Sequence, residues 1–361
     1  MDEFYMRRAL RLARKGGAWV SPNPMVGAVI VKEHRIIGEG YHQIFGGNHA
    51  EVNAINPASE TIEGSTIYVN LEPCTHYGKT PPCCESIVAC KPARVVIGTP
   101  DPNPIISGRG IESLKRHGIE TTVGVLEESC RRLNERFFKF IQTGTPFVTL
   151  KFAQTIDGRI ATATGHSRWI SSEKSLRFAH MLRSHHDAVL VGVGTLLKDD
   201  PELTVRLIRG RNPVRIVVDS YLRISPDARA LKNQNIAKTM IATTIHAGSE
   251  KRAQLAEMGI ETMLVEHDND RRVDLTKLLV ELGKRNISSV LVEGGAAIIT
   301  SLLKAKLPDR VVIVIAPKIV GKGVEAVGDL KIQSMDESLR LTYRKIRRLG
   351  DDLIIDAKIE K

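Results

Sequence analysis

Apolar positions in the first part of the chain follow two periods, which change from segment to segment. Residues 3–15 carry apolar side chains at near-helical spacing among basic ones, which predicts an amphipathic helix. Short apolar runs bounded by Gly, Pro and Asn predict strands. The expected elements are strands 25–31, 35–40, 66–71 and 94–98 and helices 3–15, 83–90 and 127–142, with a further short helix starting at residues 49–51. Strands that alternate with helices predict a layered α/β sheet.

The second part of the chain shows the same alternation after a break at Thr143-Gly144-Thr145-Pro146. Glycine and proline between a helix and a fresh strand identify this segment as a linker. Further strands are expected at 147–153, 188–192, 213–219, 239–243, 289–292 and 310–316, with helical segments between them. We therefore expect two α/β domains, residues 1–144 and 145–361, each long enough to bury its own core.

Composition narrows the class of protein. The chain has 361 residues, of which 42% are hydrophobic, and it lacks the run of about 18 apolar residues that a membrane-spanning helix needs. The N-terminus has no apolar signal-peptide core. Five cysteines, two of them adjacent at Cys83-Cys84, do not suit a disulfide framework and fit a reducing compartment. We expect a cytoplasmic protein that does not bind membranes.

The basic net charge leaves several partners open. The formal charge is +11, but lysine and arginine are spread along the whole chain and form no dense block. A solvated basic surface explains this distribution better than a nucleic-acid-binding tract. We therefore expect no nucleic-acid partner, whereas small metabolites that carry phosphate are compatible with the charge.

The strongest chemical signal is His49-Ala50-Glu51 upstream of Glu72-Pro73-Cys74 and Pro81-Pro82-Cys83. A His-x-Glu triplet by itself says little, because one is about as likely as not to occur by chance in a chain of this length. Followed by Pro-Cys at a strand end and a second Pro-Cys at a helix start, it matches the pattern of zinc deaminases. One imidazole and two thiolates would hold a tetrahedral Zn²⁺ and leave the fourth position for water. We predict His49, Cys74 and Cys83 as metal ligands and Glu51 as the proton shuttle.

The second cysteine ligand has rivals. Zinc deaminases usually have Pro-Cys-x-x-Cys, whereas here eight residues separate Cys74 from Cys83. Within this insertion His76 could also bind a metal, and Cys84 is adjacent to Cys83. A cysteine directly after two prolines is expected in the first turn of a helix, where the helix N-terminus favours a thiolate. This geometry favours Cys83 over Cys84.

With these residues in place, the chain resembles the bifunctional deaminase/reductase family of riboflavin biosynthesis over essentially its whole length. In the first domain the resemblance rests on NPMVGA at 23–28, HAE at 49–51, EPCTHYGKTPPC at 72–83 and DPNP at 101–104. In the second domain it rests on KFA at 151–153, DG at 157–158, SRWI at 167–170, GVGT at 192–195, DDP at 199–201, LTVR at 203–206 and VEGG at 292–295. The long cysteine spacing is typical of this family.

The resemblance implies a fold, two cofactors and two successive reactions. The expected folds are an N-terminal cytidine-deaminase-like three-layer α/β/α domain with Zn²⁺ and a C-terminal dihydrofolate-reductase-like α/β domain that uses NADPH. The glycines at 192–194 lack the third glycine of a Rossmann fingerprint, which agrees with this expectation. The deaminase would hydrolyse the 2-amino group of 2,5-diamino-6-ribosylamino-4(3H)-pyrimidinone 5′-phosphate. The reductase would convert the ribosyl side chain to ribityl, giving 5-amino-6-ribitylaminouracil 5′-phosphate.

The resemblance also suggests roles for single residues. Asn23, His42 and Lys79 would contact the substrate of the deaminase. Lys151 lies in an apolar strand, where an unpaired lysine is costly to bury. We hypothesise that Lys151, with Asp199 as its partner, helps to protonate the ribosylamine as hydride arrives.

The remaining residues of the reductase site fall into two groups. The residues expected at the substrate, with the arginines suited to its 5′-phosphate, are Ser167, Arg183, Leu203, Arg206 and Glu293. The residues expected at the cofactor, the last four of them in a strand-to-helix turn whose N–H groups could bind pyrophosphate, are Ala153, Trp169, Thr195, Asp199, Ser220, Gly294, Gly295, Ala296 and Ala297.

Two other functions compete with this interpretation. A tRNA adenosine deaminase would explain the basic charge, but the second domain has no aromatic-rich RNA-binding signature and the cysteine spacing does not suit that class. A structural zinc module with a metabolite-sensing domain is disfavoured because structural sites are usually closed by a fourth ligand. We expect an enzyme that acts on a small phosphorylated pyrimidine and forms a homo-oligomer.

Overall fold

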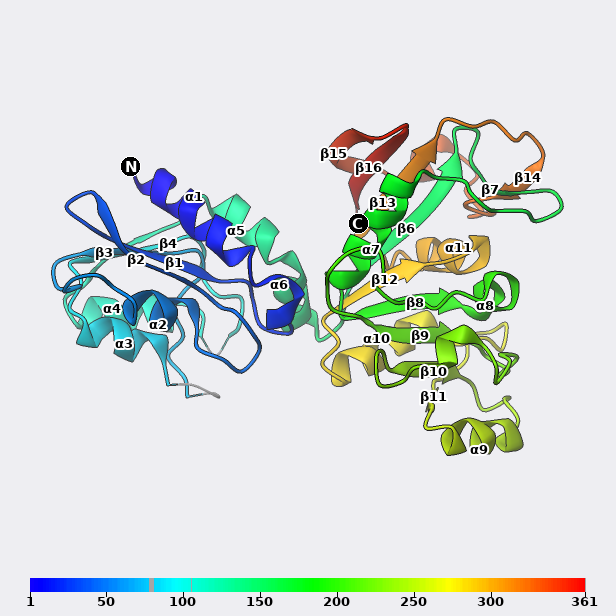
Figure 1. Ribbon diagram of the computed structural model, residues 1–361, viewed down its shortest axis with the longest axis horizontal. Coiled ribbons are helices and arrows are strands. Elements are labelled where there is room, and N and C mark those ends of the chain that lie inside the picture. The colour runs from blue at the N-terminus through cyan, green and yellow to red at the C-terminus, as the bar shows by residue number, and fades with distance from the viewer. Residues whose placement is uncertain (78–80, 105, 361) are drawn as a thin grey trace. The chain divides into compact units, whose positions relative to one another are not determined.

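The computed structural model describes residues 1–77, 81–104 and 106–360. The chain divides into two compact units, Met1–Gly144 and Thr145–Lys361 (Figure 1). Each unit has its own sheet and its own hydrophobic core. None of the described helices is long and apolar enough to cross a membrane.

The first unit is built on a five-stranded sheet in the order β2-β1-β3-β4-β5. β1 is antiparallel to β2 and β3, whereas β3, β4 and β5 are parallel. The strands are β1 (Gly27–Lys32), β2 (Arg35–Tyr41), β3 (Thr66–Val69), β4 (Arg94–Ile97) and β5 (Glu120–Val123). The helices are α1 (Asp2–Ala13), α2 (Ala50–Ile55), α3 (Cys83–Ala89), α4 (Arg109–Arg116), α5 (Glu127–Leu133) and α6 (Glu135–Thr143), with a 3-10 turn at Gly17–Val20.

Helices cover both faces of this sheet (Figure 1). Successive strand residues point to opposite faces, and both faces of β1 carry apolar side chains that the helices bury. On one face, Val29 of β1 packs in a cluster with Met6 of α1. On the other face, Ile30 packs in a cluster with Ala54 of α2 and Ile87 of α3. The predicted three-layer α/β/α arrangement is therefore confirmed.

The second unit contains a nine-stranded sheet in the order β11-β10-β9-β8-β12-β6-β13-β16-β15. The strands from β11 to β13 in this order are parallel, and β16 and β15 complete the sheet antiparallel. The strands are β6 (Phe147–Thr155), β8 (Ala188–Gly192), β9 (Val214–Val218), β10 (Thr239–Thr243), β11 (Glu261–Leu264), β12 (Ser289–Glu293), β13 (Arg310–Ala316), β15 (Leu341–Leu349) and β16 (Asp352–Ile359). β7 (Arg159–Thr162) and β14 (Gly323–Glu325) form a separate two-stranded sheet.

Central strand β12 of this sheet is buried on both faces. Val292 packs with Leu278 and Ile299 on one side, and Leu291 packs with Phe178 on the other. The helices of the unit are α7 (Glu173–Ser184), α8 (Val193–Asp199), α9 (Ser249–Glu257), α10 (Leu275–Lys284) and α11 (Ala296–Lys304), with 3-10 turns at Arg229–Leu231 and Met335–Glu337. Near-continuous apolar runs such as 289–292 are expected for parallel strands that helices cover on both sides.

The helix predicted over residues 127–142 is two helices, α5 and α6. Asn134 lies between them with a φ of −105° and a ψ of 20°, outside helical values. Its side-chain Oδ1 accepts a hydrogen bond from the backbone N–H of Met25 at 2.8 Å, and its Nδ2 donates to the carbonyl of Met25 at 2.9 Å. An asparagine that bonds a distant backbone segment competes with the helical ladder, and this tertiary contact ends α5.

The C-terminal hairpin was not among the predicted strands. β15 and β16 pair antiparallel, with a register shift between Tyr343 and Lys345. β15 is the outer strand of the sheet, so its side chains alternate poorly between buried and exposed positions. A basic, bulged edge strand avoids pairing with other sheets, and the same features hide its strand pattern in the sequence.

Asp2 joins the N-terminal helix to the sheet. Its carboxylate accepts hydrogen bonds from Nη2 of Arg94 at 2.8 Å and from the hydroxyl of Tyr68 at 2.9 Å. The hydrogen bond from Arg94 holds the pKa of Asp2 below its ordinary value. A carboxyl whose pKa is lower in the folded state stabilises the fold above its unfolded pKa, and this stabilisation is lost as the pH falls through the folded pKa.

We therefore expect an Asp2→Asn variant to be less stable than wild type at pH 7, and the difference to shrink as the pH falls below about 4, where the carboxyl takes up a proton first in the unfolded chain and at lower pH in the folded one. Denaturant unfolding at several pH values measures this difference, with Trp19 fluorescence reporting the first unit in a Trp169→Phe background. A difference that stays constant down to pH 2 would contradict the assignment.

Candidate active sites

Three side chains from separate segments converge in the first unit. His49 is the N-cap of α2, Cys74 follows β3, and Cys83 is the first residue of α3. One ligand atom from each lies within 4.8 Å of the others. Nδ1 of His49 is 3.2 Å from Sγ of Cys83 and 3.6 Å from Sγ of Cys74. Among the described residues, no other His, Cys, Asp or Glu side chains form such a group.

These three atoms fit a zinc ion. A tetrahedral Zn²⁺ with Zn–S near 2.3 Å and Zn–N near 2.0 Å separates nitrogen and sulfur ligands by about 3.5 Å, close to the distances found here. Hydrogen bonding with Cys83 lowers the pKa of the Cys74 thiol to about 4, which favours the thiolate that a metal needs. The donor set of one imidazole and two thiols, with a fourth position open, is that of a catalytic zinc site.

The two rival ligands lie elsewhere. Sγ of Cys84 points to the backbone carbonyls of Pro73, at 3.5 Å, and Gly110, at 3.8 Å. Burial raises the pKa of the Cys84 thiol to about 12, and the hydrogen bond with Cys74 also raises the pKa of Cys83, so the direction of the sulfur atoms and not their pKa separates the two cysteines. His76 is exposed at the cavity rim and is not part of the three-ligand group.

Glu51 lies in the first turn of α2, two residues after His49, and is only 4% exposed. Its Oε2 is buried and has no hydrogen-bond partner in the described structure. Burial raises the pKa of this carboxyl above its ordinary value. A buried carboxyl with an unused oxygen beside a metal-binding group can accept and return a proton.

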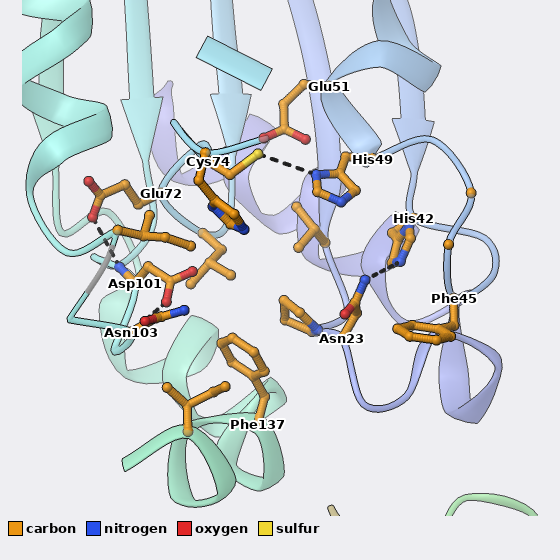
Figure 2. Close-up of a pocket in the computed structure, with 18 residues that line it drawn as sticks. Asn23, His42, Phe45, His49, Glu51, Glu72, Cys74, Asp101, Asn103 and Phe137 are labelled. Atoms are coloured by element: carbon orange, nitrogen blue, oxygen red, sulfur yellow. Dashed lines mark hydrogen bonds between the residues drawn. The ribbon is translucent and has the colours of Figure 1, made fainter. Parts of the chain in front are cut away.

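The cluster opens into a cavity of about 270 Å³ (Figure 2). Its apolar wall includes Phe45, Ile106 and Phe137. Polar groups enter from several loops, so that Asn23 and His42 lie on one side of His49 and Asp101 and Asn103 on the other (Figure 2). The described residues that line it are Asn23, Pro24, Val26, His42, Phe45, Gly46, Gly47, His49, Glu51, Leu71, Glu72, Cys74, His76, Asp101, Asn103, Ile106, Phe137 and Ile141. Such a mostly apolar cavity with a few polar groups suits a flat heterocycle.

Asn23 and His42, both predicted to contact substrate, lie together. Nδ1 of His42 is 3.0 Å from the carbonyl of Asn48, and Nε2 is 3.3 Å from Nδ2 of Asn23. Burial lowers the pKa of His42, which favours the neutral ring. A neutral ring that donates from Nδ1 to Asn48 must accept at Nε2, so Asn23 turns its NH₂ toward His42. Lys79, the third predicted contact, lies outside the described residues.

Glu72, Asp101 and Asn103 line the same cavity, although the sequence suggested no role for them. Burial raises the pKa of Asp101 to about 6. The one signal in the sequence was that Glu72 follows β3 and Asp101 and Asn103 follow β4. The two strands are parallel neighbours, so the segments after them lie at the same edge of the sheet, where ligands bind in α/β folds.

In the second unit, Lys151 and Glu293 are neighbours on the parallel strands β6 and β12. Burial lowers the pKa of Lys151, against the attraction of Glu293. The charged residues that act on Lys151 are Glu293, its neighbour in the sheet, and Arg183, whereas Asp199, the partner expected from the sequence, is the last residue of α8. The register of the parallel strands β6 and β12 places Lys151 and Glu293 side by side.

Arg183, predicted at the phosphate, is engaged within the protein. Its Nε and Nη2 donate to the carboxylate of Glu293 at 2.7 and 2.6 Å, and its Nη1 donates to the carbonyl of Thr204 at 3.1 Å. The two side chains are 12% and 13% exposed. A phosphate contact would therefore use the N–H groups that remain, while the ion pair holds Glu293 in place.

The other predicted substrate residues differ in exposure. Arg206 is exposed, and its Nη1 donates to Glu202 at 2.8 Å. The side chain of Leu203 is 2% exposed and belongs to the core, so a substrate could reach only its backbone. Ser167 is half-buried in the loop after β7.

Several predicted cofactor residues lie at the carboxyl ends of parallel strands. Gly294 and Gly295 join β12 to α11, and a Cβ on Gly294 would lie 2.0 Å from Cγ2 of Ile298. Glycine is therefore required where the chain turns into this helix. A Cβ on Gly295 would lie 3.8 Å from Oγ1 of Thr195, which places α8 beside this turn. Ala296 and Ala297 begin α11, where free N–H groups can receive phosphate.

The remaining predicted cofactor residues lie on other segments of the second unit. Trp169 is 67% exposed, and the neighbouring Arg168 donates from Nη2 to the carbonyl of Asp199 at 2.9 Å. Ser220 follows β9, and its Oγ accepts from the N–H of Val273 at 3.0 Å. Ala153 is a half-buried residue of β6.

Both units match known protein families. Residues 1–99 match the cytidine and deoxycytidylate deaminase zinc-binding region, and residues 146–355 match the RibD C-terminal domain. The riboflavin biosynthesis protein RibD of Aquifex aeolicus is 46% identical over 356 residues, which are 98% of this chain and 98% of the relative. The chain belongs to the RibD family. RibD of Escherichia coli is 39% identical, again over 98% of each chain.

Solved structures of the RibD family agree. A deaminase/reductase from Thermotoga maritima is 39% identical, covers 99% of both chains and gives a TM-score of 0.88. Membership confirms the predicted fold class, with a cytidine-deaminase-like and a dihydrofolate-reductase-like domain. The chain is thus a zinc-dependent deaminase and NADPH-dependent reductase of riboflavin biosynthesis that acts on a small molecule.

Proposed function

We propose that this chain hydrolyses the 2-amino group of 2,5-diamino-6-ribosylamino-4(3H)-pyrimidinone 5′-phosphate and then reduces the ribosyl side chain of the product with NADPH. The observation that carries this proposal is the convergence of His49, Cys74 and Cys83 with the buried Glu51 on one cavity. Lys151 and Glu293, in the other unit, would serve the second reaction. The product is 5-amino-6-ribitylaminouracil 5′-phosphate.

In the first reaction His49, Cys74 and Cys83 would hold zinc. Zinc supplies a Lewis acid that makes water nucleophilic near neutral pH. Glu51 would take one proton from this water at Oε2 and pass it to the ring nitrogen, and would then carry the second water proton to the amino group, which leaves as ammonia. Asn23 and His42 would orient the ring from the opposite side of the cavity. The overall change replaces the C–NH₂ group with C=O and consumes one water.

In the second reaction Gly294, Gly295 and the start of α11 would bind the cofactor's pyrophosphate through backbone N–H groups. NADPH supplies the hydride. Lys151 would donate a proton as the ribosylamine ring opens, and Glu293 would hold Lys151 and the sugar in place. The C–N double bond of the open form gains one hydride and one proton and becomes an amine.

The two activities are tested on the same chain. The diaminopyrimidinone phosphate is supplied with and without NADPH, and ammonia release and NADPH oxidation are measured separately. We expect ammonia in both cases and NADPH oxidation only after deamination. Ammonia from a tRNA adenosine substrate, with none from the pyrimidine, would contradict the proposal.

A Lys151→Met variant is expected to lower reductase turnover about 100-fold or more, because general acid catalysis contributes factors of this size. Methionine keeps most of the side-chain volume without the charge. Steady-state rates with the deaminated product measure the effect, and Lys345→Met, at an exposed strand position, is the matched control. Full turnover by Lys151→Met would remove the proposed role, and denaturant unfolding followed by Trp169 fluorescence in a Trp19→Phe background shows whether the second unit is folded.

We further propose that the chain works in the cytoplasm as a homo-oligomer, without nucleic-acid or membrane partners. The support is its small phosphorylated substrate and the absence of a membrane-spanning helix among the described residues. Sedimentation of the purified chain tests the oligomeric state, and a single species of monomer mass would contradict it.

A further inference from the structure

Glu72 makes an unusual set of hydrogen bonds for a carboxylate at a cavity. Its Oε2 accepts from the N–H groups of Asp101 at 3.1 Å and Gly108 at 3.0 Å. Its Oε1 accepts from those of Gly110 at 2.9 Å and Ile111 at 3.3 Å. Glu72 is 3% exposed and forms no ion pair with a lysine or arginine among the described residues. The carboxylate therefore uses all its acceptor capacity on backbone groups of one segment.

This segment forms one side of the cavity. Asp101, Asn103 and Ile106, here called the Asp101 wall, all line it. The backbone of Asp101 is held by Glu72, and Oδ1 of Asp101 accepts from the N–H of Asn103 at 2.8 Å. Figure 2 shows Glu72 next to Asp101, on the side away from His42. The backbone position of the Asp101 wall therefore depends on the hydrogen bonds of Glu72.

The other end of Glu72 is tied to the metal ligands. It lies two residues before Cys74, and its own N–H donates to the carbonyl of Thr99 at 3.0 Å. A Cβ on Gly110 would lie 2.2 Å from the carbonyl oxygen of Pro73, so the first turn of α4 packs directly against the segment between β3 and Cys74. The Glu72 side chain connects the ligand segment to the wall without itself touching a ligand atom.

We propose that Glu72 is a positioning residue of the deaminase, which fixes the position of the Asp101 wall relative to the metal-binding residues so that the substrate can bind. The inference rests on the proposed function of this cavity. Glutamine at position 72 has nearly the same shape, but its NH₂ group would face two N–H donors and accept from neither. Two buried N–H groups would lose their acceptor, and the wall would shift while the three metal ligands keep their contacts.

The test compares Glu72→Gln with Glu112→Gln, the same chemical change at an exposed position of α4. For Glu72→Gln we expect KM for the diaminopyrimidinone phosphate to rise about 10- to 100-fold, as for a misplacement near 1 Å, with kcat changed less than threefold. Zinc content and reductase activity should stay at wild-type values. Glu112→Gln should match wild type in every measurement.

Hydrogen exchange provides a readout that needs no substrate. The amides of Asp101, Gly108, Gly110 and Ile111 should exchange faster in Glu72→Gln, and those of α2 should not. Unchanged exchange at these amides, an unchanged KM, or loss of zinc would each overturn the positioning role. If wild type released no ammonia from this substrate, the proposed function would fail, whereas the exchange result would still decide whether Glu72 holds the wall.

Discussion

A Glu51→Gln variant is expected to release ammonia about 100- to 10,000-fold more slowly than wild type, because a positioned proton carrier contributes factors of this size. Oε2 of Glu51 is buried beside the three metal-binding side chains and has no hydrogen-bond partner among the residues that the structure describes. Glutamine fills the same space and cannot take a proton from water. Substrate binding and metal binding use other atoms, so both should survive the change.

Ammonia release under saturating substrate measures the loss, and metal analysis shows whether zinc is kept. Glu63→Gln is the matched control, because Glu63 is an exposed glutamate of the same unit. NADPH oxidation with the deaminated product reports on the other unit of the same molecule. A turnover within threefold of wild type in a zinc-loaded Glu51→Gln chain would show that another group carries the proton.

A Cys83→Ala variant is expected to lose both zinc and deaminase activity, whereas Cys84→Ala should keep both. Sγ of Cys83 lies 3.2 Å from Nδ1 of His49, and its removal leaves two ligands, too few for a stable zinc site. Sγ of Cys84 faces the carbonyls of Pro73 and Gly110 in the core. Its loss removes one buried sulfur and affects packing alone.

Metal content after dialysis against a weak chelator distinguishes the two variants, with ammonia release as the second measurement. Reductase activity should stay near wild type in both, because the two units have separate cores. Retention of zinc by Cys83→Ala together with its loss from Cys84→Ala would reverse the ligand assignment.

Much of this site could be predicted because its chemistry is local. His49 and Glu51 are two residues apart at a helix start, and Cys74 and Cys83 follow prolines at a strand end and a helix start. The spacing of these motifs indicated the metal and the proton carrier. The alternation of strands and helices indicated two α/β units for the same reason, since each element depends on its own short pattern.

Side chains that depend on distant partners could not be assigned in this way. The sequence left Cys84 open as a ligand, and the rotation of α3 decides that its sulfur faces Pro73. It suggested Asp199 as the partner of Lys151, whereas strand register supplies Glu293. It extended one helix through Asn134, whose side chain instead bonds Met25.

For this protein, the sequence by itself determined the two units, the family and the metal-binding residue types, because each of these depends on patterns of residues that lie close together in the chain. The tertiary structure decided which of two adjacent cysteines reaches the metal-binding group, that Glu293 accompanies Lys151, and that Glu72 holds the Asp101 wall. Each of these depends on packing between segments far apart in the chain, where a rotation of about 100° per helical residue or a shift of one strand position changes every contact.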